Sequence, residues 1–347
     1  MANGTKTLRY ILILLLILTL IIVVAASIGA AKVSLKDTGL IIASFIPGVN
    51  NFINTTHLNP QEIVIISQIR LPRIFLSIFV GIALAGAGVI FQGLFRNPMA
   101  DPFVIGVSAG AAFGATIGLL FTTAIRFLNI STTTLFALLG ALATTFLVYS
   151  ISSARGKVSV TTLLLSGIAL SAMLSSMTSF IMIFKANNMA KIIFWIMGSL
   201  TAASWYKFNI IAPMIVVLMI ISGFYMRDLN IISLGDERAA QLGVQTDRVK
   251  KILLIMASLI AALAVSVSGI IGFVGLITPH ILRLIVGPDH KILYPTSAVA
   301  GGIVLLLSDT LARTVLSPRE IPVGIVTSIV GVPFFLYLLV KSKKQVF

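Results

Sequence analysis

The chain has 347 residues, of which 58% are hydrophobic and only 10% are charged, and its mean hydropathy is +1.09. Soluble domains are about 45–50% apolar and roughly 25% charged, and a soluble fold has too little interior to hide so many apolar side chains. The composition therefore excludes a soluble globular protein and predicts a polytopic membrane protein.

The net charge of +15 raises the question of nucleic-acid binding. However, the basic residues stand in short clusters between long apolar segments, which is the distribution that the positive-inside rule produces. We therefore expect no nucleic-acid partner. Because the chain contains no cysteine, it also has no disulfide, no thiolate nucleophile and no Cys-ligated metal.

The first apolar run covers residues 10–31, and Lys6 and Arg9 precede it. A signal peptide is the alternative interpretation, since small residues follow the run's centre. The run is longer than the roughly 7–15 residues of a signal core and is long enough to cross about 30 Å of hydrocarbon. We favour a retained first span whose N-terminus is cytoplasmic. Residues 32–68 are more polar and fit an outer loop, with an interfacial helix over residues 38–46 that stops at Pro47-Gly48.

Nine further apolar runs predict spans at residues 70–94, 106–120, 132–150, 159–184, 208–226, 252–267, 273–286, 294–311 and 323–340. Residues 192–200 are too short to cross and predict a partial helix. Residues 126–131 and 317–322 fit outer turns, and the basic SSARGK at 152–157 fits an inner turn. The sequence thus predicts one all-α transmembrane domain over residues 1–347, with about ten spans and both termini cytoplasmic.

A faint internal repeat links two glycine-rich stretches. GVIFQGL at residues 88–94 is followed by Pro98, and GIIGFVGL at residues 269–276 is followed by Pro279. The first lies on an inward-running span and the second follows an outward-running one. This weak signal predicts two five-helix halves of opposite topology, an arrangement common in transporters.

The long polar segment at residues 227–251 holds nine charged residues and lies between two apolar spans. Its middle begins with Gly-Asp-Glu, which places acids near the positive end of a helix, and stops at Gly243. The segment predicts a cytoplasmic coupling loop with a short helix over residues 235–243, where a soluble partner could push. A merely solvated inner loop is the alternative.

No catalytic or nucleotide-binding motif is present. The chain lacks GxxxxGK[ST] and GxSxG, and His57, His280 and His290 are far apart and lack metal-ligand spacing. These absences predict a chain that is not an enzyme and that binds neither ATP nor a metal.

The acids give little sign of an ion relay, which would require a well-buried carboxylate or unwound backbone carbonyls. Asp101, Asp289 and Glu320 fall in turns, and Asp309 lies close to the outer end of its span. A transporter driven by a partner is the favoured hypothesis. An ion-coupled secondary transporter that acts without an ATPase is the alternative.

Four segments carry a recognisable pattern: RLPRIFLSIFVGIALAGAGVIFQGLFRNPMADPFVIGVSAGA, GDERAAQLGV, GIIGFVGLITPHILRLIVGPDHK and SDTLARTVLSPREIPVGIVTSIVGVPFFLYLL. Together they resemble the FecCD/BtuC-type permease subunits of type II ABC importers for iron–siderophores, haem, vitamin B12 and related chelates. The resemblance covers roughly residues 60–344, with the motifs in family order.

The resemblance implies a BtuC-like homodimer in the inner (cytoplasmic) membrane, in contact with lipid. It also implies two cytoplasmic ATPase subunits, which carry the ATP and Mg, and an extracytoplasmic substrate-binding protein. The cargo stays open among iron–siderophore, haem, cobalamin and an oxyanion such as molybdate.

The resemblance also assigns docking residues on both membrane faces. The ATPase would dock on the short helix, at Gly235, Asp236, Glu237, Arg238, Ala239, Ala240, Gln241, Leu242 and Gly243. The binding protein's glutamates would pair with Arg70, Arg73 and Arg313, with Arg319 in the same outer turn. Arginine suits this task because its fork takes a carboxylate bidentately. The alternative is snorkelling toward lipid headgroups.

Two further groups match the family. Architectural turns near the inner gate are expected at Asn97, Pro98, Asp101, Pro102, Pro279 and His280, with His280 hydrogen-bonded rather than a metal ligand. By analogy, the fifth and tenth spans line the translocation path at the dimer axis. The fifth would contribute Ser171, Met173, Met177 and Phe180, although such a methionine stripe also fits ordinary packing or lipid contact.

Overall fold

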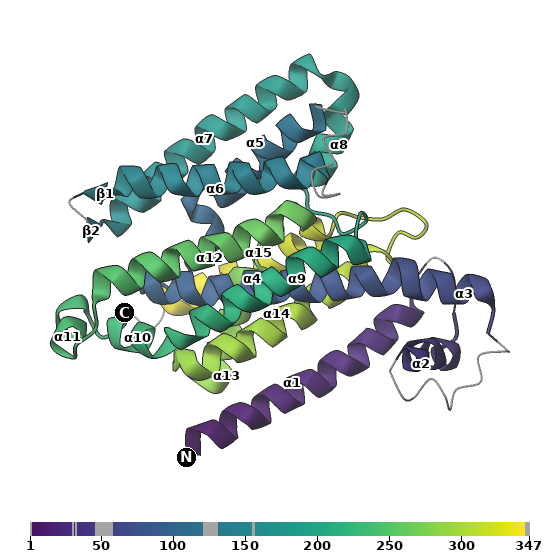
Figure 1. The fold of residues 1–347 in the computed structure, drawn as a ribbon, viewed down its shortest axis with the longest axis horizontal. Helices are drawn as coiled ribbons and strands as arrows, with labels where there is room; N and C mark the ends of the chain where they lie inside the picture. The colour runs from purple at the N-terminus through teal and green to yellow at the C-terminus, as the bar shows by residue number, and fades with distance from the viewer. Residues whose placement is uncertain are drawn as a thin grey trace.

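The computed structural model describes residues 2–29, 31, 33–45, 58–120, 131–154 and 157–343. It is a bundle of helices (Figure 1). The expected Pro47-Gly48 stop, His57 and most of the outer turn predicted at residues 126–131 lie outside the described residues.

Among the described residues, seven helical segments are long and apolar enough to cross a membrane. They are α1 (Ala2–Ser27), the continuous helix of α3 (Pro60–Val64), η2 (Ile65–Arg70) and α4 (Leu71–Leu94), α6 (Thr132–Ser152), α7 (Val160–Phe184), α9 (Trp205–Phe224), α12 (Thr246–Ser268) and α14 (His290–Ala312). Three further helices contain shorter apolar stretches: α5 (Val107–Leu120), α13 (Val274–Val286) and α15 (Val323–Lys343), which is apolar over Val323–Leu338. These seven long and three further helices together coincide with the ten predicted apolar runs. Length and composition identify only the seven as membrane-spanning, so the count of ten spans stays a prediction.

The centre of the bundle is α4, which packs against α14, α12, α13 and α9. Small residues allow this packing: a Cβ on Gly81 would lie 2.3 Å from the carbonyl oxygen of Gly301. α5, α6 and α7 form a second group, which Figure 1 shows above α12, while α1 packs against α14 on the other side. α4, α12 and α14 are therefore mostly buried, whereas α1, α6, α7 and α9 each expose a large apolar face.

The second span begins earlier than the sequence predicts. The sequence places its start at Arg70, yet the helix runs unbroken from Pro60 through a π-helical segment, Ile65–Arg70. Proline has no backbone N–H and its ring crowds the carbonyl four residues earlier. The wider π turn directly before Pro72 relieves both problems, so the proline stays inside the helix.

The short elements refine the predicted loops. α2 (Leu35–Ser44) lies on the expected interfacial helix, α8 (Ala186–Ile196) begins before the predicted partial helix, and α10 (Met226–Ile232) and α11 (Asp236–Gln241) make the polar segment largely helical. In the SSARGK turn, β1 (Ser153–Ala154) pairs antiparallel with β2 (Lys157–Val158), a small departure from the all-α prediction. η3 (Pro102–Ile105) precedes α5.

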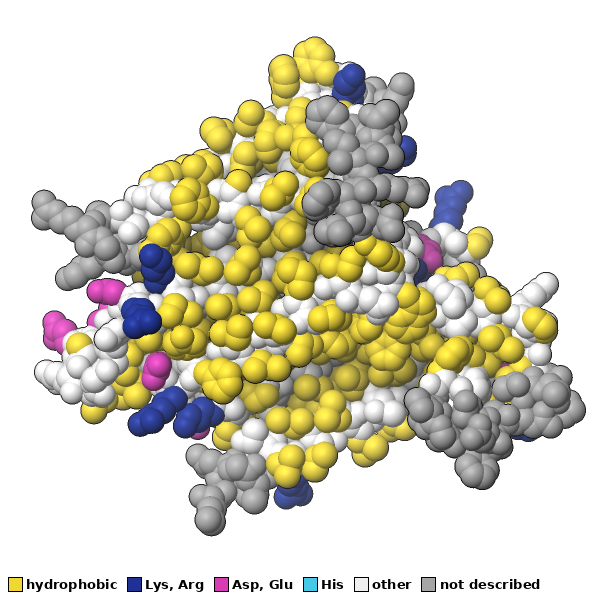
Figure 2. All heavy atoms as spheres, in the orientation of Figure 1, with side chains coloured by type: hydrophobic (Ala, Val, Ile, Leu, Met, Phe, Trp, Pro, Cys, Tyr) yellow, Lys and Arg dark blue, Asp and Glu magenta, His cyan; other side chains and the backbone are white. Residues whose placement is uncertain are grey.

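The two ends of the bundle differ in character. Arg73 lies at the start of α4 and Arg96 follows its end, about 30 Å away. Because Arg96 bonds to Asp236 of α11, we call the two ends the Arg73 end and the α11 end. The start of α1 and the end of α15 lie toward the α11 end (Figure 1). Hydrophobic side chains cover the middle of the face in Figure 2, and charged side chains gather toward its edges, as expected of a protein that spans a membrane.

Candidate coupling and docking surfaces

α11 is a six-residue helix between two glycines with left-handed backbone, Gly235 at φ 121° and Gly243 at φ 83°. Both angles lie where only glycine is comfortable. Ala239 is 0% exposed and packs into the main core, while Asp236, Glu237, Arg238 and the residues from Ala240 to Gly243 are exposed. The helix is thus anchored through one alanine and presents its charged face outward.

Asp236 clamps α11 to the rest of the bundle. Its carboxylate accepts from Lys250 Nζ on α12 at 2.5 Å and from Arg96, which follows α4. Partial burial alone would raise the pKa of Asp236, but the hydrogen bond from Lys250 and the charge of Arg96 outweigh it, and the pKa is lowered. Two ion pairs therefore connect α11 to α12 and to the residue that follows the end of α4.

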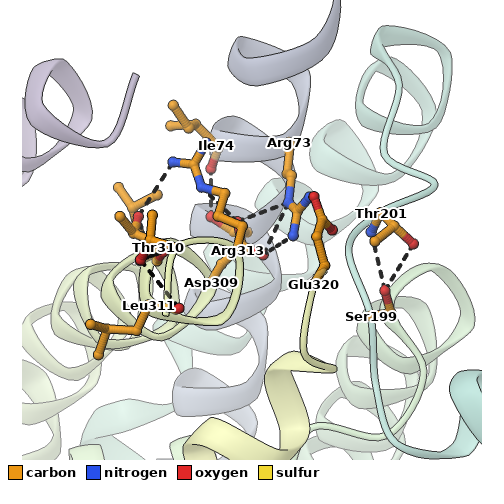
Figure 3. A network of polar contacts seen from close by, with 12 residues as sticks. Arg73, Ile74, Ser199, Thr201, Asp309, Thr310, Leu311, Arg313 and Glu320 are labelled. Atoms are coloured by element: carbon orange, nitrogen blue, oxygen red, sulfur yellow. Dashed lines mark hydrogen bonds and ion pairs between the residues drawn. The ribbon is translucent and has the colours of Figure 1, made fainter. Parts of the chain in front are cut away.

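Arg73 forms the centre of a charged cluster at the opposite end. It donates from Nε and Nη2 to Asp309 at 2.9–3.1 Å and from Nη1 to both oxygens of Glu320 at 2.9 and 3.0 Å. Figure 3 shows its guanidinium between the two carboxylates, with Arg313 on the far side of Asp309. The Arg313 Nε lies 3.9 Å from the carboxylate of Asp309. All three guanidinium nitrogens of Arg73 therefore bond to acids of the same chain.

Arg70 and Arg313 are buried, at 5% and 6% exposure, and hold the end of α1. Arg70 donates to the carbonyls of Ala26 at 2.6 Å, Ser27 at 3.0 Å and Ala31, and Arg313 donates to that of Ala25. These are carbonyls at or beyond a helix end, where partners are missing and positive charge is favourable.

Of the four arginines assigned to binding-protein docking, the exposed one is Arg319. Arg73 shows only 11% of its side chain. In this conformation the guanidinium groups of Arg70, Arg73 and Arg313 bond within the protein rather than facing outward. Their assignment as docking residues stays a prediction.

The turn after α4 breaks the helix, as its prolines predict. Asn97 Oδ1 accepts from the N–H of Met99 at 2.9 Å, and Asp101 Oδ1 accepts from that of Phe103 at 2.8 Å. Pro98 lies between Asn97 and Asp101, and Pro102 begins η3. Burial raises the pKa of Asp101 to about 6. Both polar side chains thus stabilise the turn backbone, which is an architectural role.

Pro279 lies inside α13 and does not break it. It cannot bond to the carbonyl of Gly275, four residues earlier, and this carbonyl points at α4, where a Cβ on Gly88 would lie 1.8 Å from its oxygen. The neighbouring His280 was expected to be hydrogen-bonded. Within the described part of the chain its buried Nδ1 has no hydrogen-bond partner.

The residues assigned to the path divide between two faces of α7. Ser171 lines a groove of about 660 Å³, whose other walls include Phe103 of η3 and Ser108 of α5. Met173, Met177 and Phe180 are not among its walls and are 51%, 45% and 62% exposed. The structure therefore does not bring these four residues together.

Comparison with known proteins identifies the chain. The model of the FecCD transport family matches residues 14–341. The chain belongs to the FecCD transport family. The cobalamin import permease BtuC of Halobacterium salinarum is 44% identical over 80% of this chain and 73% of its own length. The hemin permease HmuU of Yersinia pestis is 39% identical over 80% and 84% of the two chains.

A solved structure described as an inward-facing conformation of a metal-chelate type ABC transporter shares the fold. It superposes with a TM-score of 0.81 at 31% identity, over 96% of this chain and 99% of the other. This FecCD protein is accordingly a multi-pass permease subunit of the ABC importer class and not an enzyme. Among the described residues no group of three or more His, Cys, Asp or Glu is placed to hold a metal.

The sequence missed the charged partners that organise both surfaces of this FecCD protein. Asp309 was noted only as lying near a span end, yet it is 0% exposed and is the well-buried carboxylate that seemed absent. The Asp309–Arg313 spacing of four residues, one helical turn, was a visible signal. The contacts of Arg73 with Glu320 and of Arg96 with Asp236 span more than a hundred residues, and nothing local reveals them.

Proposed function

We propose that this chain forms the membrane path of an ATP-driven importer for a metal chelate, as a homodimer with two ATPase subunits at the α11 end. A substrate-binding protein would dock at the Arg73 end. On this proposal the α11 end and both termini are cytoplasmic, in agreement with the basic residues that gather in the inner segments.

The observation that carries the proposal is that one helix joins both surfaces. At its start, α4 holds Arg73, which binds Asp309 and Glu320, and after its end Arg96 binds Asp236 of α11. Between them α4 is almost wholly buried. Coupling between distant sites requires an element whose state both sites bias, and α4, which is buried and bonded at both ends, is the element that we assign to this role.

The path belongs to the interface between two copies. Met173, Met177 and Phe180 form an exposed apolar face of α7 that a second copy would cover, while Ser171 and the adjoining groove of about 660 Å³ face inward toward α5. Chelates of the kinds named for the relatives, cobalamin and hemin, are the cargo class that this family membership supports.

Reconstitution tests the proposal directly. The purified chain in liposomes, alone or together with its ATPase and binding protein, is assayed for uptake of cobalamin, haem and a ferric hydroxamate. We expect uptake of one of these against its gradient only from the complete assembly with ATP. Uphill uptake by the chain alone would contradict the proposal.

The buried Asp309 favours one second candidate, an ion-coupled transporter, because buried acids mark ion paths. Its oxygens, however, are taken by Arg73 and face Arg313, as in a structural ion pair. Uptake that follows an imposed proton or sodium gradient, and that Asp309→Asn abolishes, would support this candidate over the first.

A further inference from the structure

A groove runs between α6 and α12 on the outside of the bundle. Its walls are the helical stripe from Leu142 to Tyr149 on α6 and the stripe from Lys251 to Leu259 on α12. Phe146 and Ile255 are exposed along it, at 69% and 41%. The groove therefore opens onto the apolar outer surface, where a membrane protein meets lipid.

The walls offer almost nothing to a polar ligand. The hydroxyl of Thr145 donates to the carbonyl of Ala141 at 2.9 Å, and that of Ser258 donates to the carbonyl of Leu254 at 2.7 Å. Both hydroxyl protons are thus used within their own helices, and the other side chains along the floor are apolar. Such a surface is stabilised by a hydrocarbon chain rather than by a hydrogen-bonding solute.

One end of the groove is charged. Lys251 is exposed, and its Nζ lies 5.6 Å from the ring centroid of Tyr149, which places the ammonium over the aromatic face. Within the described part of the chain Lys251 has no acidic partner, whereas the neighbouring Lys250 is bound to Asp236. Tyrosine and lysine at a helix end are typical of the headgroup level of a bilayer.

The dimensions fit a segment of one acyl chain. Tyr149 and Leu142 lie seven residues apart on α6, or about 10 Å along the helix. The cavity volume of about 300 Å³ is at the lower limit of the roughly 300–1,000 Å³ found for small-molecule sites. It is less than half that of the groove beside Ser171, so a bulky chelate does not fit it.

We propose that this groove binds an anionic phospholipid. One acyl chain lies between α6 and α12, and the headgroup phosphate pairs with Lys251 beside the ring of Tyr149. Basic pockets between transmembrane helices hold anionic headgroups in this way. This lipid site is separate from the transport role. It rests on the proposed function only for its leaflet, because that proposal makes the α11 end cytoplasmic and so places the headgroup in the cytoplasmic leaflet.

Native mass spectrometry of the purified full chain tests the site with phosphatidylglycerol and phosphatidylcholine of identical acyl chains. We expect preferential retention of phosphatidylglycerol, and Lys251→Gln should weaken its binding about fivefold without changing that of phosphatidylcholine. Ile255→Trp should weaken both lipids by filling the groove, and Lys251→Arg should keep the preference. Lys291→Gln, which removes an exposed charge at the same end, is the matched control.

Equal retention of the two lipids would overturn the proposal, as would a loss in Lys251→Gln no larger than that in Lys291→Gln. Thermal melting of each variant shows whether it is folded. If Lys251→Gln does not fold, the comparison of Lys251→Arg with Ile255→Trp still tests the site. The assay requires no ATPase, binding protein or cargo. Its failure is therefore distinct from a failure of the proposed transport function.

Discussion

At the scale of single residues, Asp309 is buried inside α14 against two arginines. Arg73 donates three contacts to its carboxylate, and Arg313 lies 3.9 Å away. Glu320, the other partner of Arg73, has 38% of its side chain exposed. The two acids bind the same arginine in different surroundings, and burial should decide how much each stabilises the fold.

Asp309→Asn should therefore destabilise the protein far more than Glu320→Gln. Breaking a buried pair typically costs about 3–5 kcal/mol, whereas an exposed pair contributes about 0–1 kcal/mol. Thermal melting of both variants in the same detergent measures the difference. Equal shifts in Tm would show that Asp309 is not the buried centre of the cluster.

Asp101 gives a pH-dependent stability with a defined sign. Burial raises its pKa to about 6, above the roughly 3.9 of an unfolded chain. The protonated form stabilises the fold below about pH 4, and this stabilisation is lost as the pH rises through 6. Asp101→Asn retains an oxygen to accept from Phe103 N–H and removes the ionisable group.

We expect Asp101→Asn to stabilise the protein at pH 8 by at most about 3 kcal/mol, seen as a higher Tm, and by about half as much at pH 5. Melting curves at both pH values, each against wild type, give the comparison. A variant that gains as much at pH 5 as at pH 8 would refute the assignment.

Residue-level prediction worked where the cause was local. The two glycines around α11 and the Asn97 and Asp101 turn follow from neighbouring sequence. The sequence placed Ala239 on the docking face, whereas the structure buries it in the core. It did not show that Arg70 and Arg313 cap α1, because the carbonyls they bind are 39 or more residues away. The sequence does not distinguish a basic residue that binds a partner protein from one that caps the end of a neighbouring helix.

At the scale of elements, the two stretches of the weak internal repeat lie against each other. Gly88 of α4 faces the carbonyl of Gly275 on α13, and Gln92 donates to the carbonyl of Leu276 at 3.0 Å. The sequence marked both stretches by their glycines. It did not show that the stretches touch, and the unbroken α13 around Pro279 follows from a carbonyl turned toward α4 rather than from local propensity.

Gly88→Ala should push α4 and α13 apart. The added Cβ would meet backbone at 1.8 Å, and backbone cannot move aside as a side chain does. We expect a loss of about 1–3 kcal/mol and a lower yield of folded protein. Gly223→Ala in α9 is the matched control, since nothing lies within 4 Å of its added Cβ. A Gly88→Ala variant that melts like Gly223→Ala would contradict the close approach.

At the scale of the whole molecule, hydropathy located the ten apolar helices found in the described part of the chain, because the requirement that every backbone polar group be satisfied in lipid leaves few alternatives. The family's motifs then indicated where the two functional surfaces lie. The physical link between them, α4 clamped at both ends, emerges only from the folded chain. We therefore propose that ATPase docking on α11 and binding-protein docking at the Arg73 end are coupled through α4.

The central claim, that a soluble ATPase engages α11, can be tested on a chain that has no native cysteine. Glu237→Cys and Arg319→Cys each carry a benzophenone maleimide, and the complex with the cognate ATPase is irradiated in proteoliposomes. We predict a cross-link to the ATPase from position 237 and none from position 319, at the opposite end of the bundle. An ATPase cross-link from position 319 but not from 237 would contradict the account, and so would the absence of any cross-link from 237 in an assembled complex.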